Sequence, residues 1–264
     1  MLQSISLCDE LIFELRHDDE ISLTCDDQSI PVDDSNLVVR AARALSSRHG
    51  ANIKLVKRIP AKGGLGGGSS NAAVTLLALN QLWRVGLAAS DLRQIGSELG
   101  ADVAFFFSGG TALATGTGTQ VDEVPDVPKQ HLIIITPNTS VSTAIAYESL
   151  NAPSLTTSDS VSILSSSFTE PFSGDSSQWP LHNDFEGVFF EREPEIRRAK
   201  LALLDAGARG ALLAGSGSSV FGIFTDAAAR DRALEDLRCE AGWRVFACHT
   251  LSRSDYCQAI KTGA

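Results

Sequence analysis

The sequence lacks the features of secreted, membrane-spanning and zinc-binding proteins. Its 264 residues include five cysteines, an odd number, at wide spacings and with no C-x-x-C pair, which argues against a disulfide framework and a zinc site. No apolar run approaches the ~18 residues of a spanning helix. The N-terminus reaches Asp9 and Glu10 before any basic residue, unlike a signal peptide. These absences predict a cytoplasmic protein with no protein-built metal site.

Basic residues are also scarce, since 22 lysines and arginines face 32 acidic residues and the formal net charge is -10 at pH 7. A chain this acidic does not bind a nucleic-acid backbone or an anionic membrane over a broad surface. The segment from Ser35 to Ser90, by contrast, contains no Asp or Glu, and its eight lysines and arginines give it a local charge of +8. We therefore expect a small, phosphate-bearing ligand as the partner, and no nucleic acid or membrane.

Glycine is concentrated in this acid-free stretch, between Gly63 and Gly68, where five of the six residues are glycine. A predicted strand at 52–55 precedes the cluster and a predicted apolar helix at 71–79 follows it. Backbone N–H groups and the helix dipole at such a junction bind phosphate, so we expect a nucleotide triphosphate here. The alternative is a tight turn or hinge. Neither G-x-x-x-x-G-K-[ST] nor G-x-G-x-x-G fits the cluster.

The remaining pattern is that of an α/β protein with two domains. Alternating and helical spacings predict a strand at 20–25, a helix with apolar positions from 37 to 45, and a helix at 91–99 with Ser90 as N-cap and Gly100 as its end. The acidic, proline-containing segment 122–128 predicts a boundary between domains 1–127 and 128–264. The second domain is predicted to contain strands at 131–136, 209–214, 220–224 and 243–248 and helices at 142–150, 184–206 and 227–238. This order is typical of a split βαβ sandwich, and the Ser-, Thr- and Pro-rich residues 151–180 are predicted to form a surface insertion.

Several motifs resemble those of the GHMP small-molecule kinases. Residues 60–73, PAKGGLGGGSSNAA, are similar to that family's P-x-x-x-G-L-G-S/G-S-S-A/N-A phosphate loop. Residues 99–106, LGADVAFF, resemble a segment of one branch of the family that differs from the mevalonate and homoserine kinases. Residues 215–221, GSGSSVF, resemble its third glycine motif. The resemblance covers nearly the whole chain and implies a two-domain α/β (α+β) fold, with an N-terminal ATP-binding domain and a C-terminal split βαβ (ferredoxin-like) sandwich.

The resemblance also implies the chemistry, which is ATP-dependent phosphorylation of a small alcohol with Mg²⁺. Asp102 matches the base that accepts or orients the acceptor hydroxyl; the alternative is an aspartate that caps a helix. The residues that match the ATP-binding loop are Pro60, Ala61, Lys62, Gly63, Gly64, Leu65, Gly66, Gly67, Gly68, Ser69 and Ser70. Of these, Ser69 or Ser70 is expected near the metal ion.

Four further positions match binding residues of the family. Lys57 and Asn36 match residues near the adenine or ribose, with solvated surface residues as the alternative. Gly217 and Ser218 match the acceptor or phosphate side, and a plain glycine turn between two strands explains them equally well. Thr143 matches a residue near the substrate.

The chain departs from the family pattern at its start. The family begins with a P-A-K-x-N-L strand and a G-Y-H turn, which supply a lysine and groups at the acceptor, and no lysine precedes Lys54 here. Because the other motifs are intact, we expect the natural protein to begin earlier. The competing expectations are a GHMP kinase for another small alcohol and a truncated, non-catalytic nucleotide-binding relative.

Overall fold

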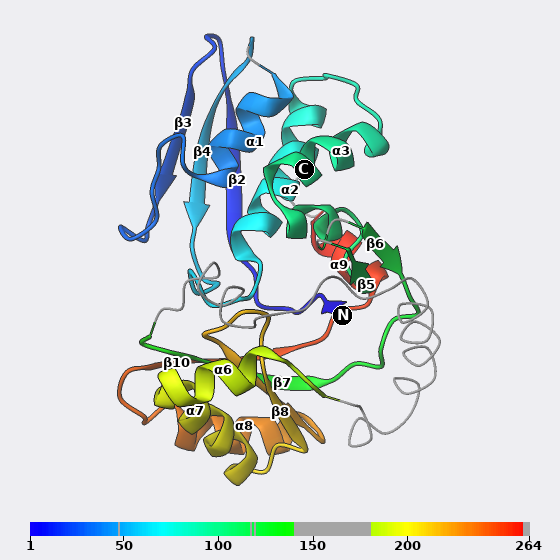
Figure 1. Cartoon of the computed structure of the whole chain (residues 1–264). Helices are drawn as coiled ribbons and strands as arrows, with labels where there is room; N and C mark the ends of the chain where they lie inside the picture. The colour runs from blue at the N-terminus through cyan, green and yellow to red at the C-terminus, as the bar shows by residue number, and fades with distance from the viewer. Residues whose placement is uncertain (47, 117, 119, 140–180, 261–264) are drawn as a thin grey trace.

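The computed structural model describes residues 1–264 apart from 47, 117, 119, 140–180 and 261–264. Figure 1 shows two groups of elements, one above the other. The upper group, blue to green, contains the strands and helices of the first half of the chain. The lower group, green to orange, contains a second sheet with its helices. The expected α/β architecture is therefore confirmed.

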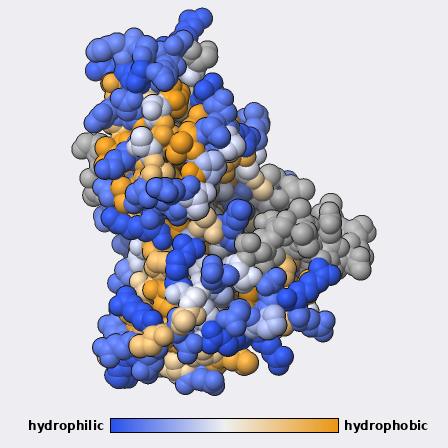
Figure 2. Space-filling view, turned by 90° about the vertical axis from the view of Figure 1, so that its left-hand side faces the viewer, coloured by the Kyte–Doolittle hydropathy of each residue, from blue (hydrophilic) through white to orange (hydrophobic). Residues whose placement is uncertain are grey.

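The upper group is built on a mixed sheet of order β2-β4-β3. β2 (Glu10–Arg16) is antiparallel to β4 (Gly50–Val56), and β3 (Ile21–Cys25) is parallel to it, with α1 (Leu37–Leu45) as the crossover. Alternate residues of β4 are buried against α1 and α2 (Gly67–Leu82). The opposite face of the sheet is open. Figure 2, viewed from the left-hand side of Figure 1, shows hydrophobic residues gathered in the upper half, and Ile12 of β2, on the face opposite Leu11 and Phe13, is 42% exposed.

α3 (Ala89–Leu99), the 3₁₀ helix η1 (Ala101–Phe107) and a small antiparallel sheet complete the upper group. This sheet has the order β1-β5-β6, formed by β1 (Leu2–Gln3), β5 (Thr111–Thr115) and β6 (Gln120–Glu123). The last helix, α9 (Arg253–Ala259), returns to it (Figure 1). Arg253 forms an ion pair with Glu123 at 3.3 Å. The end of the chain therefore packs on its first half.

The lower group is an antiparallel sheet of order β10-β7-β9-β8. Its strands are β7 (His131–Pro137), β8 (Gly210–Leu213), β9 (Val220–Phe224) and β10 (Trp243–His249), and its helices are α6 (Phe185–Arg192), α7 (Pro194–Asp205) and α8 (Ala227–Leu237). Buried side chains of β7 and β9 pack against α7 and α8. The chain order and strand order are those of a split βαβ sandwich, as predicted.

Three boundaries differ from the sequence-based expectations. α2 begins at Gly67 and not at Asn71, because Gly66 already adopts the left-handed conformation that starts the helix. The N-cap of α3 is Ala88 and not Ser90. The predicted helix 184–206 is divided at Glu193, because Pro194 occupies the first turn of a new helix, where its missing N–H has no intrahelical acceptor.

Other elements were missed or lie outside the described part of the chain. β1, β2, β5, β6 and α9 were not predicted. β2 lacks a clean alternation, since its outward face carries the large apolar residue Ile12. The predicted helix 142–150 and the insertion 151–180 lie outside the described residues. Among the described residues, no helix is long and apolar enough to cross a membrane.

Candidate functional site

Residues 60–70 run from the end of β4 into α2, and this connection leaves backbone donors free. Gly66, with φ +68°, is the N-cap of α2 and offers no side-chain acceptor. The N–H groups of Gly67, Gly68 and Ser69 in the first turn consequently have no acceptor among the described residues. The positive end of the helix dipole lies at the same place. This end of α2 is therefore suited to an anion.

The glycines of this connection are required by close approach of other segments. A Cβ at Gly64, where φ is +71°, would lie 2.2 Å from the carbonyl oxygen of Ala214. At Gly66 it would lie 2.9 Å from the ring of Phe106 in η1. The connection is thus packed between η1 and the turn that joins β8 to β9, and side chains larger than glycine do not fit at Gly64 and Gly66.

The turn at 215–219 joins β8 to β9 and lies directly against the glycine connection. The Ser219 N–H donates to the Gly63 carbonyl oxygen at 3.1 Å. Ser218 is 1% exposed, and its hydroxyl has no partner within the described residues. The structure therefore brings the predicted pair Gly217 and Ser218 together with Gly64, while the same residues also form the strand-joining turn.

Asp102 lies in the first turn of η1, the element that packs on Gly66 through Phe106. Its side chain reaches the surface, yet the surrounding protein removes part of its hydration and so raises the pKa of the carboxyl group. No described residue donates a hydrogen bond to it. The N-cap of η1 is Gly100, so Asp102 is not a capping aspartate. A free carboxylate with a raised pKa can accept a proton.

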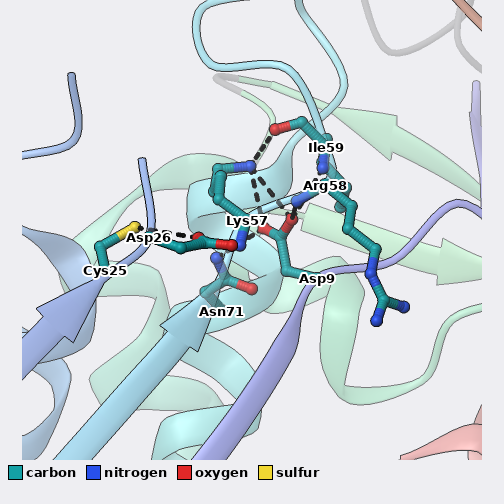
Figure 3. A network of polar contacts seen from close by, with 7 residues as sticks. All are labelled: Asp9, Cys25, Asp26, Lys57, Arg58, Ile59 and Asn71. Atoms are coloured by element: carbon teal, nitrogen blue, oxygen red, sulfur yellow. Dashed lines mark hydrogen bonds and ion pairs between the residues drawn. The ribbon is translucent and has the colours of Figure 1, made fainter. Parts of the chain in front are cut away.

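The Lys57 ammonium points toward the Asp9 carboxylate and the Ile59 carbonyl oxygen (Figure 3). Its side chain is 7% exposed and its ammonium group forms an ion pair with Asp9 at 2.9 Å. The same ammonium donates to the carbonyl oxygen of Ile59. The structure therefore places Lys57 directly after β4, just before the glycine connection, with its charge directed at a buried carboxylate, and not as a solvated residue.

Asn36 is the N-cap of α1, where its side-chain oxygen accepts from the Val38 N–H at 2.9 Å and its amide donates to the Pro31 carbonyl oxygen at 2.6 Å. Both polar groups of the side chain are thus used within the protein. Thr143 lies outside the described residues.

Two residues of the site were missed by the sequence analysis. Asp9 directly precedes β2, and nothing around it in the sequence indicates a buried carboxylate. Tyr256, on the unpredicted α9, donates from its hydroxyl to the Phe106 carbonyl oxygen at 2.7 Å and also shares a hydrogen bond with the Ser70 side chain. Burial raises the pKa of Tyr256 and keeps it a neutral donor. It joins η1 to the first turns of α2.

The residues present fit the triphosphate of ATP. The first turn of α2 supplies free N–H groups, and Lys62, exposed and at φ 56°, has no anionic partner in the described part of the chain. No group of three or more His, Cys, Asp or Glu side chains among the described residues could hold a metal ion. Mg²⁺ would therefore be held largely by phosphate oxygens, with Ser69 or Ser70 as a hydroxyl ligand.

Comparison with known proteins agrees with this geometry. Residues 36–110 match the GHMP kinases N terminal domain and residues 173–242 match the GHMP kinases C terminal domain. The 4-diphosphocytidyl-2-C-methyl-D-erythritol kinase of Syntrophotalea carbinolica is 39% identical over 94% of this chain and 88% of its own length. The enzyme of that name from Syntrophus aciditrophicus is 40% identical over 95% of this chain and 89% of its own length.

Solved structures give the same result. A crystal structure of 4-(cytidine 5'-diphospho)-2C-methyl-D-erythritol kinase superposes with a TM-score of 0.71 at 31% identity, covering 93% of this chain and 87% of that one. Homoserine kinase from Cytophaga hutchinsonii shares the fold, with a TM-score of 0.70 at 22% identity over 95% of this chain and 88% of its own. The chain belongs to the GHMP kinase family of ATP-dependent small-molecule kinases.

Proposed function

We propose that the chain transfers the γ-phosphate of ATP to the 2-hydroxyl of 4-diphosphocytidyl-2-C-methyl-D-erythritol, a step of non-mevalonate isoprenoid precursor biosynthesis. The observation that carries the proposal is the free N–H array at the start of α2, packed against the helix η1 that holds Asp102. Relatives that are 37–40% identical over about 95% of the chain bear the name of this kinase, which supports the choice of acceptor.

The phosphate groups of ATP would be bound by residues 60–70. The N–H groups of Gly67, Gly68 and Ser69 would donate charge-assisted hydrogen bonds to phosphate oxygens, and the exposed Lys62 would add a positive charge. Mg²⁺, when bound, neutralises charge between the phosphates. Positioning and charge neutralisation make up most of the catalysis of phosphoryl transfer, so a rigid connection is an advantage.

Asp102 would act on the acceptor. Its carboxylate accepts the proton of the attacking hydroxyl, and the raised pKa makes it a stronger base than a fully hydrated aspartate. Gly217 and Ser218 would line the acceptor or phosphate side, because their turn touches the glycine connection. The Ser218 hydroxyl is buried in this turn and has no hydrogen-bond partner among the described residues.

The remaining roles are proposals of the same kind. Asn36 and Lys57 are proposed near the adenine or ribose; for Lys57 the contact would have to be made beside its ion pair with Asp9. Thr143 is proposed near the acceptor. We propose domains 1–127 and 128–264, with α9 returning to the first, a cytoplasmic location, and a small-molecule acceptor with no nucleic-acid or membrane partner.

The test is an acceptor panel with the wild-type chain and Asp102→Asn. Wild type should phosphorylate 4-diphosphocytidyl-2-C-methyl-D-erythritol in preference to homoserine or mevalonate, in a coupled ADP-release assay. Asp102→Asn removes the base but keeps the size of the side chain, so kcat should fall roughly 10²-fold or more while ATP affinity is unchanged.

Three results would count against the proposal. A preference for homoserine or mevalonate would reassign the acceptor. ATP binding without transfer to any acceptor would favour the non-catalytic nucleotide-binding alternative. Near-normal turnover of Asp102→Asn would remove this carboxylate from the mechanism.

A further inference from the structure

A single buried carboxylate, that of Asp9, lies at the base of the glycine connection (Figure 3). Glu10 pairs with Val56 in the antiparallel ladder of β2 and β4, so Asp9 lies opposite the point where the chain leaves β4. Its side chain is 1% exposed. The sheet therefore places the backbone of Asp9 beside the end of β4.

The Asp9 carboxylate accepts hydrogen bonds from the segment that enters the connection. One oxygen accepts from the backbone N–H groups of Arg58 and Ile59, each at 2.7 Å. The preceding N–H, that of Lys57, donates to Asp26 at 2.7 Å. Three consecutive amides of the entering segment are thus held by two carboxylates.

The other Asp9 oxygen contacts the segment that leaves the connection. It accepts from the side-chain amide of Asn71 at 2.9 Å. Asn71 lies in α2 just after Ser70 and is 5% exposed. Both ends of residues 60–70 are consequently tied to one carboxylate, which fixes their separation.

Lys57 neutralises this carboxylate. Its ammonium lies 2.9 Å from one Asp9 oxygen and 3.2 Å from the other. A buried charge that loses its partner is unfavourable, whereas a pair whose remaining hydrogen bonds are satisfied is tolerated. Because the Lys57 ammonium also donates to the Ile59 carbonyl oxygen, the lysine adds a second tie to the entering segment.

We propose that Asp9 is a positioning residue for ATP: by clamping both ends of residues 60–70, it holds the first-turn N–H groups of α2 at the separation that triphosphate binding needs. The proposal rests on the proposed function, in which this connection binds the phosphates. Asp9 itself is buried and contacts no ligand. Its effect on catalysis passes through the backbone of the connection.

The test is Asp9→Asn in the full chain. The amide retains one acceptor oxygen, but its NH₂ group faces the donors of Lys57 or Asn71, so the clamp opens on one side. We expect the Kd of a non-hydrolysable ATP analogue, measured by calorimetry, to rise about tenfold or more. KM for ATP should rise in parallel while KM for the acceptor stays within about twofold, and amide hydrogens of residues 60–70 should exchange faster.

A matched control separates positioning from loss of stability. Asp226→Ala removes a carboxylate that accepts from the Ala229 N–H at 2.8 Å as the N-cap of α8, in the lower group. It should lower Tm and leave the Kd of the analogue unchanged. If Asp9→Asn behaves in the same way, with a lower Tm, a wild-type Kd and wild-type exchange in residues 60–70, the proposal is wrong.

A second variant covers the case in which Asp9→Asn does not fold. Asn71→Ala releases only the α2 side of the clamp and should raise the Kd of the analogue by a smaller factor with faster exchange at 60–70; an unchanged Kd would again overturn the proposal. The binding readouts are independent of turnover. Wild-type protein that binds the analogue but phosphorylates no acceptor would contradict the proposed function. The positioning role of Asp9 would still be tested by the Kd of the analogue and by amide exchange in residues 60–70.

Discussion

Residues 63–70 and 215–219 are two runs rich in glycine and serine, yet their hydrogen bonding differs. In the first run, the N–H groups of Gly67, Gly68 and Ser69 have no acceptor within the described residues. In the second, the N–H of Gly217 donates to the Ala214 carbonyl oxygen at 2.9 Å and that of Ser219 donates to Gly63 at 3.1 Å. The first run therefore has free N–H donors, whereas the N–H groups of Gly217 and Ser219 in the second run bond to carbonyl oxygens of the protein.

The difference follows from what each run connects. The first opens a helix, whose initial N–H groups have no preceding carbonyl groups to bond. The second closes two antiparallel strands, where a turn returns the chain to its own ladder. Glycine content alone therefore does not distinguish a phosphate site from a structural turn; the element that follows does. The second run also packs against the first, through the Ser219 hydrogen bond to Gly63 and the close contact of Gly217 with Gly64.

The contact between the two runs can be broken at Gly64. An alanine there must adopt φ +71° and would place its Cβ 2.2 Å from the Ala214 carbonyl oxygen. Left-handed strain and overpacking together predict a loss of about 3 kcal/mol in the free energy of unfolding, measured by urea denaturation, with loss of ATP binding.

Gly86→Ala is the control for that prediction. Gly86 has φ +80° but nothing lies within 4 Å of its added Cβ, so only the conformational strain of roughly 1 kcal/mol should appear. Equal losses for the two variants would show that the runs are not in tight contact.

The serines sharpen the comparison. Ser219 is 0% exposed and its hydroxyl pairs with that of Thr136 at 2.8 Å, so Ser219→Ala leaves a buried hydroxyl unpaired and should cost about 1–2 kcal/mol of stability. Ser69→Ala removes no described hydrogen bond and should change stability by less than about 0.5 kcal/mol, while KM for Mg-ATP rises. A loss of stability in Ser69→Ala together with a raised KM for Mg-ATP in Ser219→Ala would show that the second run, not the first, binds the phosphates.

Ser218 carries the smallest expected effect on stability. Its buried hydroxyl has no partner among the described residues, so Ser218→Ala should leave the unfolding free energy unchanged or raise it by up to about 1 kcal/mol. If the hydroxyl meets a ligand oxygen, the stabilisation of the variant by ATP and acceptor, read as the shift in Tm, should be smaller than that of wild type. A loss of stability without ligand would indicate a structural partner instead.

Much of the fold could be predicted because it depends on local pattern. The buried alternation of β4, the helical spacing of α1 and the β-α-β-β-α-β order of the lower group are all visible in the sequence. α9 and β2 could not be predicted, because α9 is a short helix defined by its contacts and β2 carries apolar residues on both faces. The prediction of Ser90 as the N-cap of α3 was wrong, because the connection after α2 already starts the helix at Ala89.

The site divides in the same way. The position of the glycine connection between β4 and α2 was predictable from motif and charge. The solvated-surface alternative for Lys57 was wrong, because the side chain lies in a buried ion pair with Asp9. Nothing local marks this difference, since the pairing depends on where β2 starts relative to the end of β4.

Local sequence is enough to place a glycine-rich connection before α2 within an acid-free stretch, because backbone freedom and local charge are properties of neighbouring residues. The contacts that hold this connection in place depend on tertiary packing. Asp9 meets Lys57 and Asn71 across 48 and 62 positions of sequence, and Tyr256 meets Phe106 across 150. Such pairings exist only after the sheet and helices have packed, because burial and register, not local spacing, bring the groups within hydrogen-bonding distance.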